Sequence, residues 1–236
     1  MKKTLLTLGA ILFASVYASA DNIESYVGSK PSGVINSQMT FNGYSATDPY
    51  GTATFPVGGG TPAVALSPAG SGPLKGWFGP LGSSTWVGEN IGFQPGGTTN
   101  PPKGFYDYET TFSATGTFNL AIDVLADDTT RVLLNGVEIE PPGALGGDTH
   151  CGANKPGCDL VTEEVMASTL ETGIGLNTLS FIVQQAGTGH LDPSGVDFSG
   201  TVTPTVGESP VPEPESLVLL ASGLVGLAGC VRRRLA

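Results

Sequence analysis

The middle of the chain alternates apolar and polar residues with a period of two. In residues 105–114, FYDYETTFSA, and in residues 117–126, TFNLAIDVLA, every second side chain is aromatic, aliphatic or threonine. Successive side chains of a β-strand point to opposite faces of its sheet, so this pattern predicts two strands that each bury one face. They are joined around Gly116, and their expected inward residues are Tyr106, Tyr108, Thr110 and Phe112, then Phe118, Leu120, Ile122 and Val124.

A β-hairpin is predicted directly after these strands. In RVLLNGVEIE, residues 131–140, the pair Asn135-Gly136 separates two short apolar runs. Asparagine and glycine accept the positive φ angles of a two-residue type I′ turn, which matches the twist of paired strands. Two further strands are expected in NTLSFIV and GVDFSGTVT, with inward residues Leu179, Phe181 and Val183, then Val196 and Phe198.

The first half of the chain carries shorter patterns. Residues 26–104 are rich in glycine, serine, threonine and proline, and strand-like pieces occur at 34–44, 52–57 and 62–66. Apolar residues do not recur with a helical period, and glycine interrupts every longer window. Strand after strand without helices predicts an all-β fold, a jelly roll or β-sandwich, over residues 21–202, with the clearest pattern in residues 84–202.

The chain begins with the three parts of a secretory signal peptide. Lys2 and Lys3 precede an apolar stretch from Leu5 to Tyr17, and the small residues Ala18 and Ala20 form an A-x-A cleavage site. We therefore expect residues 1–20 to be removed on export and the mature chain to begin at Asp21.

The C-terminal segment also consists of three distinct parts. Residues 203–215 are a proline-rich linker that contains Pro212, Glu213 and Pro214, residues 216–231 are uncharged, and Arg232, Arg233 and Arg234 follow. Sixteen helical residues span about 24 Å against a hydrocarbon core of about 30 Å. The arginines act as a positive-inside stop. The pattern predicts one short transmembrane helix with a basic cytoplasmic tail at 232–236.

The order of these parts resembles the PEP-CTERM sorting signal. That resemblance implies recognition by an exosortase, a membrane-embedded protease similar to cysteine transpeptidases, with Pro212, Glu213 and Pro214 as recognition residues. It implies transient anchoring in the inner membrane, cleavage near the motif, and delivery to the cell surface or extracellular matrix. Such systems accompany exopolysaccharide production in biofilm-forming Gram-negative bacteria, so this chain is expected to be a substrate of the protease.

The net charge of the exported part limits the kinds of molecule that it can bind. All 21 acidic residues follow position 20, and only five basic residues lie between Asp21 and Glu215, so the exported part has a net charge near −16. A surface of this sign repels nucleic acid and anionic lipid, and it favours neutral ligands or cations.

A second resemblance concerns the exported domain. The segments STWVGEN, YDYETTF, ADDTTRVLLNGVEI, GLNTLSFIVQQAG and PSGVDFSGTV occur in this order between residues 84 and 202. Together they resemble jelly-roll modules of the galactose-binding-like type in bacterial exported proteins. The resemblance implies a β-sandwich, often one that binds carbohydrate.

Some residues have the chemistry of sugar recognition, which needs flat aromatic faces and hydrogen-bonding side chains. The alternative is that the tyrosines and Trp86 are simply core residues. Asp127 and Asp128, at a strand end, are candidates for a structural Ca²⁺ site, or else they start a turn. The candidate ligand-binding residues are Trp77, Trp86, Tyr106, Tyr108, His190 and Asp192.

Cys151 and Cys158 enclose a short Gly/Pro-containing loop. In an exported protein this spacing favours a disulfide, which would stabilise the fold by about 2.5 kcal/mol on the chain-entropy estimate. A metal site that combines both cysteines with His150 is the rival interpretation, and it lacks C-x-x-C spacing.

Catalytic motifs are not found in the sequence, which has two histidines and neither H-E-x-x-H nor G-x-S-x-G. We therefore expect no enzyme activity and no cofactor beyond the candidate Ca²⁺. The expected function is a surface or matrix protein whose domain binds a ligand, such as extracellular polysaccharide, or has a structural role. The alternative is a secreted carbohydrate-active enzyme with a glycosidase-type carboxylate pair drawn from Asp107, Glu109, Glu163 and Glu164.

Overall fold

The computed structural model describes residues 20–28, 30–49, 60–69, 77–114, 117–145, 156–158, 165–168, 175–187 and 192–205. The chain divides into two units, Met1–Thr205 and Val206–Ala236. The second unit carries the Pro-Glu-Pro motif and the three arginines and lies outside the described residues, as do residues 1–19 and the strand predicted at 52–57.

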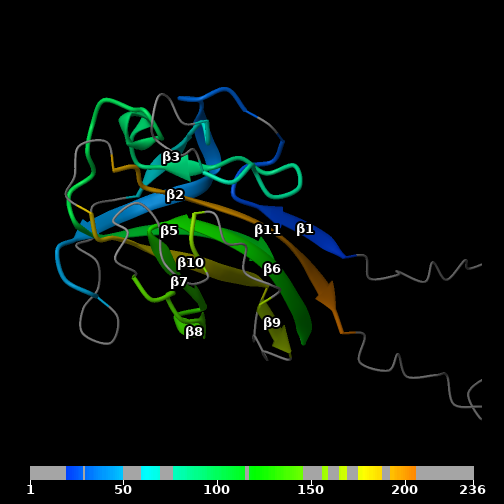
Figure 1. The fold of residues 1–236 in the computed structure, drawn as a ribbon. Coiled ribbons are helices and arrows are strands. Elements are labelled where there is room, and N and C mark those ends of the chain that lie inside the picture. Colours follow the sequence, from blue (N-terminus) through cyan, green and yellow to red (C-terminus); the bar gives the residue numbers. More distant parts are fainter. Residues whose placement is uncertain are drawn as a thin grey trace, which may run out of the picture. The chain divides into compact units, whose positions relative to one another are not determined.

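The described part of the chain is built from strands and a single turn of 3₁₀ helix (Figure 1). The all-β class predicted from the sequence is confirmed. The strands are β1 (Asp21–Glu24), β2 (Ile35–Ser45), β3 (Thr61–Ala65), β4 (Val87–Gly88), β5 (Gly104–Ser113), β6 (Phe118–Asp127), β7 (Thr129–Leu134), β8 (Val137–Glu140), β9 (Val165–Ser168), β10 (Leu176–Gln185) and β11 (Gly195–Pro204), and the 3₁₀ turn η1 is Ile91–Phe93.

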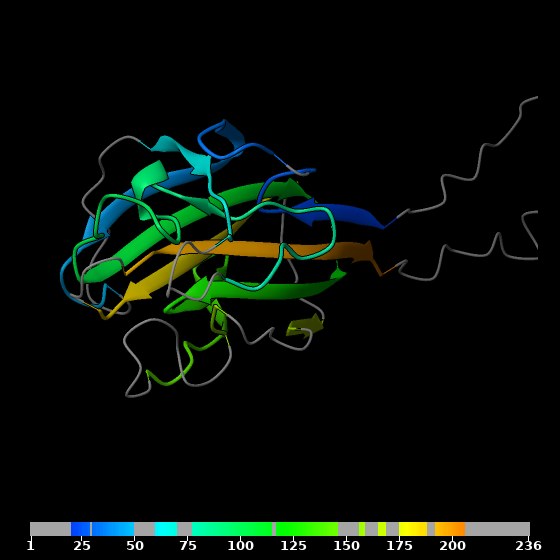
Figure 2. The same cartoon turned by 45° about the horizontal axis from the view of Figure 1, so that its top comes forward.

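Hydrogen bonds join these strands into one antiparallel order that folds over into a sandwich. The order is β8-β7-β10-β5-β2-β3-β4-β11-β6-β9. β4 pairs with β11 at Val196, and β1 pairs with β11 further along, from Ser199 to Val202. We call β8-β7-β10-β5-β2 the first layer and β4-β11-β6-β9 with β1 the second layer; β3 pairs with strands of both (Figures 1 and 2). Aromatic side chains pack between the two layers, and they come from strands that are not hydrogen-bonded neighbours in the sheet. Phe181 of β10 stacks on Phe198 of β11 at a ring-centroid distance of 4.6 Å.

The inward rows predicted from the period-two pattern form the main core. Phe112 of β5 meets Phe118 of β6 edge to face at 5.5 Å. Thr110 is half-buried, and its hydroxyl donates to the Gln38 carbonyl. The other predicted inward residues are at most 8% exposed: Tyr106, Tyr108, Phe112, Phe118, Leu120, Ile122, Val124, Leu179, Phe181, Val183, Val196 and Phe198.

The hairpin is also confirmed. β7 and β8 pair from Leu134 and Val137 outward, and Asn135 and Gly136 have φ angles of 51° and 81°. The Asn135 side chain also stabilises the turn, because its Oδ1 accepts from the Thr178 amide at 2.9 Å. The turn therefore connects β7 to β8 and is also hydrogen-bonded to β10.

The sequence did not reveal several short strands. β1 is four mostly polar residues at the expected start of the mature chain, β4 has two residues, and β9 pairs with β6. None of them is long enough to show alternation of apolar and polar residues. Each is defined by its pairing with the edge of a longer strand. β11 runs to Pro204, within the first residues of the segment assigned to the linker.

A second apolar cluster lies on the outer face of the second layer. Leu125 of β6 follows the inward-pointing Val124, so it faces away from the main core, yet it is fully buried. The covering segment, residues 77–86, provides Trp77 and Trp86, whose rings stack at 4.2 Å with an interplanar angle of 23°. We call this group the tryptophan cluster; it consists of Leu66, Trp77, Leu81, Trp86, Leu125 and Cys158.

One buried carboxylate fastens the covering segment to β11. Asp197 accepts hydrogen bonds from the hydroxyls of Ser25 and Ser84, both at 2.6 Å, and from the Leu81 amide at 2.8 Å. Burial raises the pKa of Asp197, and the two serine hydroxyls partly offset this effect. The carboxylate thus ties Ser25, which follows β1, and two residues of the covering segment to β11.

No helix within the described ranges has the length and apolar character needed to cross a membrane. The predicted span at residues 216–231 lies outside those ranges.

We predict that Phe198→Ala lowers the free energy of unfolding by about 3–5 kcal/mol, because it removes the ring that stacks between the layers and leaves a cavity. Denaturant unfolding measures this directly. Leu176→Ala is the control: its side chain is 66% exposed, and the expected change is within about 0.5 kcal/mol. Equal losses in the two variants would contradict the assignment of the core.

Candidate functional site

Three buried aspartates meet at one end of the second layer. Asp127 ends β6, Asp128 follows it, and Asp192 lies just before β11. Their exposed fractions are 0%, 1% and 2%. One carboxylate oxygen from each lies within 4.8 Å of the others, so residues far apart in the sequence form a compact cluster of oxygen atoms. We call Asp127, Asp128 and Asp192 the aspartate trio.

Neighbouring segments hold the trio in place. The Trp77 indole Nε1 donates to Asp127 Oδ2 at 2.5 Å, which links the trio to the tryptophan cluster. Asp128 Oδ2 accepts from the Ala186 amide at 2.6 Å. The Asp128 amide donates to the Gln184 carbonyl at 3.0 Å, so both contacts of Asp128 reach the end of β10. The peptide bond between Asp127 and Asp128 is cis.

The Asp127 carboxyl group is buried beside two other carboxyl groups, those of Asp128 and Asp192. Burial raises the pKa of Asp127 well above its usual value, and the charges of Asp128 and Asp192 raise it further. The hydrogen bond from Trp77 works in the opposite direction. No basic group is among the causes that act on this carboxyl.

Among the described residues, two buried side chains in this part of the fold, Asp127 and Gln185, have polar atoms without a hydrogen-bond partner. Asp127 Oδ1 is buried and accepts no hydrogen bond from the residues that the structure describes. Gln185 is 1% exposed, and within the same residues neither its amide oxygen nor its amide nitrogen has a partner. Gln185 stands between Gln184 and Ala186, the two residues that contact Asp128. The site therefore offers carboxylate oxygens, a donor type that binds a hard cation.

The sequence had named parts of this site under different headings. Asp127 and Asp128 were Ca²⁺ candidates, whereas Asp192 and Trp77 were candidates for sugar binding; the structure brings all four together. The sequence analysis did not single out Gln185. Its position, next to the strand end that contacts Asp128, depends on the pairing of β10 with β7, which no local motif reveals.

The aromatic residues considered for sugar stacking are placed in the interior, which corrects that expectation. Trp77 is 6% exposed, and Trp86, Tyr106 and Tyr108 are at most 1% exposed. Their polar atoms bond inward: Trp86 Nε1 donates to the Phe78 carbonyl, Tyr106 Oη donates to the Pro102 carbonyl, and Tyr108 Oη accepts from the Glu89 amide. Rings buried to this degree cannot stack on a surface ligand, and this agrees with the alternative that they are core residues. His190 lies outside the described residues.

The outer face of the first layer carries a polar group around Asp107. This side chain is 6% exposed and accepts from Asn42 Nδ2 at 3.2 Å, while Ser180 Oγ donates to Glu109 at 3.0 Å. Burial, assisted by the charge of Glu109, raises the pKa of Asp107 to about 7, although the Asn42 hydrogen bond lowers it. Asp107 and Glu109 point to the same face because they are two residues apart on β5; Glu163 and Glu164 are outside the described residues.

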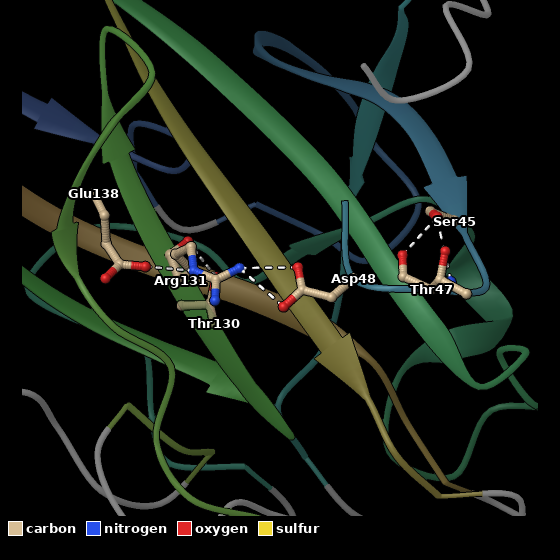
Figure 3. A network of polar contacts seen from close by, with 6 residues as sticks. All are labelled: Ser45, Thr47, Asp48, Thr130, Arg131 and Glu138. Carbon is tan, nitrogen blue, oxygen red and sulfur yellow. Dashed lines mark hydrogen bonds and ion pairs between the residues drawn. The ribbon is translucent and has the colours of Figure 1, made fainter. Parts of the chain in front are cut away.

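Arg131 ties the edge of this face together. Its Nε donates to Glu138 on β8 at 2.5 Å, and its Nη1 donates to Asp48, in the turn after β2, at 3.0 Å (Figure 3). In the same turn, Ser45 Oγ donates to the Thr47 carbonyl at 2.6 Å. The guanidinium is thus engaged with structural partners on both sides.

A shallow polar groove lies on the second layer, over β1, β11 and β6. Its volume is about 560 Å³, within the usual range for small-ligand sites. Acidic, amide and hydroxyl groups line it, together with the backbone of Gly82 and Gly200; the polar residues are Asn22, Glu24, Ser83, Asp123, Ser199 and Thr201. We call it the β1–β11–β6 groove.

Cys158 is 2% exposed within the tryptophan cluster, and its carbonyl accepts from the Phe78 amide at 2.9 Å. Cys151 and His150 lie outside the described residues. The pairing of Cys151 with Cys158 stays a prediction.

Comparison with protein-family models matches residues 210–234 to the PEP-CTERM protein-sorting motif. The motif indicates an exported protein that is anchored in the membrane before processing, and exosortase is the processing partner that it implies. No curated protein and no solved structure matches the chain.

We predict that Asp107→Asn stabilises the protein above neutral pH and has little effect in acid. The Asp107 carboxyl has a pKa of about 7 in the folded state against an ordinary value of 3.8, so folding favours its protonated form. Its contribution to stability is complete below pH 4 and is lost as the pH rises through 7. The variant should be more stable than the wild type by on the order of 2 kcal/mol at pH 8.

Denaturant unfolding of both proteins at pH 4, 6 and 8 tests this dependence. Glu109→Gln serves as the control, because it removes only the neighbouring charge and should give a smaller gain at pH 8. A difference between Asp107→Asn and the wild type that is the same at all three pH values would contradict the assigned pKa.

Proposed function

We propose that this chain is an exosortase-processed protein of the cell surface or extracellular matrix, whose β-sandwich is a non-catalytic binding or structural module. The sorting motif at residues 210–234 is the observation that carries the proposal, because it gives the chain a route of export and a processing partner. The all-β domain is the part that this route delivers.

The arrangement of the strands supports processing at both ends. Asp21, the residue expected to follow signal-peptide cleavage, is the first residue of β1 and pairs with Val202 of β11. β11 itself ends at Pro204, before the Pro-Glu-Pro motif. Both chain ends therefore leave from neighbouring strands, and cleavage at either end removes no residue of the described sheet.

The ligand class that we propose is a neutral, hydroxyl-rich polymer such as an extracellular polysaccharide. The β1–β11–β6 groove is lined by carboxylate, amide and hydroxyl groups that can exchange hydrogen bonds with sugar hydroxyls. Among the described residues, its lining has acidic side chains and neither lysine nor arginine, which disfavours anionic ligands. The lining given by these residues has no aromatic side chain for stacking, so each sugar unit would bind weakly, and useful retention would come from many copies along one polymer.

A secreted glycosidase is the second candidate function. Asp107 and Glu109, adjacent on the outer face of β5, are the observation in its favour, since one has a raised pKa and could serve as an acid. The binding module is preferred because Asp107 is nearly buried and is held by Asn42, an arrangement that suits a structural group.

Processing predicts a defined mass for the protein released from cells. We expect signal-peptide cleavage after Ala20 and a new C-terminus near Pro212 to Pro214, and intact-mass spectrometry of the released protein measures both. A variant with Ala at positions 212 and 214 should stay in the membrane fraction, whereas Pro204→Ala, upstream of the motif, should be released normally. A released protein that still ends in Ala236 would refute processing.

Binding and turnover can be separated with the same released protein. A glycan array should show weak retention on neutral polysaccharides that increases with multivalent display, and an assay for reducing ends should show no hydrolysis. Asp123→Ala with Thr201→Ala should abolish retention by removing two groups of the groove, while Thr178→Ala, on the first layer, should not. Hydrolysis that is lost in Glu109→Gln would favour the enzyme; silence in both assays would leave a structural role.

A further inference from the structure

We propose that the aspartate trio is a Ca²⁺ site that joins the two layers of the sandwich. The sequence named only Asp127 and Asp128 for this role; the structure adds Asp192 as a third ligand and gives the site its surroundings. The proposal does not depend on the polysaccharide groove, which is lined by other residues.

The spacing of the carboxylate oxygens suits this ion. Ca²⁺ binds oxygen at about 2.3–2.6 Å, so two of its ligands can be at most about 5.2 Å apart. The oxygens of the trio lie within 4.8 Å of one another, so small side-chain adjustments are enough for one ion to bind all of them. Mg²⁺ binds at about 2.0–2.1 Å and demands near-ideal octahedral geometry, whereas Ca²⁺ tolerates longer and irregular spacing, so Ca²⁺ is the ion that we propose.

The donor chemistry leads to the same ion. The trio supplies only carboxylate oxygens, and no histidine or cysteine of the described residues takes part in the cluster. Zinc prefers nitrogen and sulfur ligands, whereas Ca²⁺ prefers oxygen and accepts six to eight donors in a flexible geometry. Water and an amide oxygen are ordinary members of such a shell.

Burial provides a second, independent observation. Asp127 Oδ1 is buried without a hydrogen-bond donor among the described residues, although Oδ2 of the same group is held by Trp77. Gln185, next to the backbone that holds Asp128, is a buried amide with both polar atoms unsatisfied within that part of the chain. Buried polar atoms are rarely left in this state unless a ligand satisfies them, and an ion at the trio would use the free carboxylate oxygen.

The location explains what the ion would do. Asp127 belongs to β6 and Asp192 leads into β11, both in the second layer, while Asp128 is bonded to the end of β10 in the first layer. Trp77 extends the link to the tryptophan cluster. A Ca²⁺ ion at this point would hold both layers and the covering segment together at one end of the fold.

Titration of metal-stripped wild-type protein tests the proposal directly. The processed protein is treated with EDTA, dialysed and titrated with CaCl₂; one Ca²⁺ per chain should bind, and the melting temperature should rise by about 5 °C or more at saturation. MgCl₂ at equal concentration should have a clearly smaller effect. Tb³⁺ should occupy the same site and show emission sensitised by tryptophan, since Trp77 contacts one ligand. Absence of stoichiometric Ca²⁺ binding by native mass spectrometry would overturn the proposal without any variant.

Variants locate the ion. Asp127→Asn and Asp192→Asn should each weaken Ca²⁺ binding by about tenfold or more, because each removes a charged ligand. Asp107→Asn is the matched control: it also neutralises a buried carboxylate, but on the other layer, and it should bind Ca²⁺ like the wild type. Circular dichroism establishes that each variant is folded, and Asp192→Glu offers a milder change if an asparagine variant does not fold. Wild-type affinity in the folded Asp127 and Asp192 variants would place the ion elsewhere and refute the site.

Discussion

The packing of two rows of large side chains between the layers is the interaction on which the rest of this structure depends. Phe181 and Phe198 stack where β10 crosses β11, and Phe112 meets Phe118 where β5 faces β6. β5 and β6 are consecutive in sequence but pair with different strands. The apolar rows therefore hold together two layers that strand pairing, among the described residues, connects only through β3. Apolar burial of this extent is the main driving force for folding.

This use of the aromatic residues also limits what the surface can do. Tyr106 and Tyr108 are in the core, and the two tryptophans form a second cluster, so these four rings stabilise the fold and are not displayed. The groove proposed for binding, the β1–β11–β6 groove, is lined mainly by polar groups. If the module binds as proposed, such a groove suits weak, repeated contacts better than tight binding of a single small molecule.

The buried polar groups have two different roles. Asp197 is fully engaged by Ser25, Ser84 and the Leu81 amide, so it fastens a loop and needs no further partner. Asp127 is in the opposite situation, since it has one hydrogen bond from Trp77 and two acidic neighbours. The contrast between a satisfied and an unsatisfied carboxylate, in adjacent parts of the same layer, is the reason for assigning a ligand to one and a structural role to the other.

The sequence by itself determined the all-β class, the inward rows of β5, β6, β10 and β11, the Asn135-Gly136 hairpin and the C-terminal sorting motif. All of these depend on local signals: a period of two, a turn with positive φ angles, or a contiguous signal. Only the tertiary structure decided which strands are neighbours, which tryptophans are buried, and that Asp192 lies beside Asp127 and Asp128. Asp192 is more than sixty positions from Asp127 and Asp128. Their contact arises from the folding of one sheet order into two layers, for which the sequence carries no local signal.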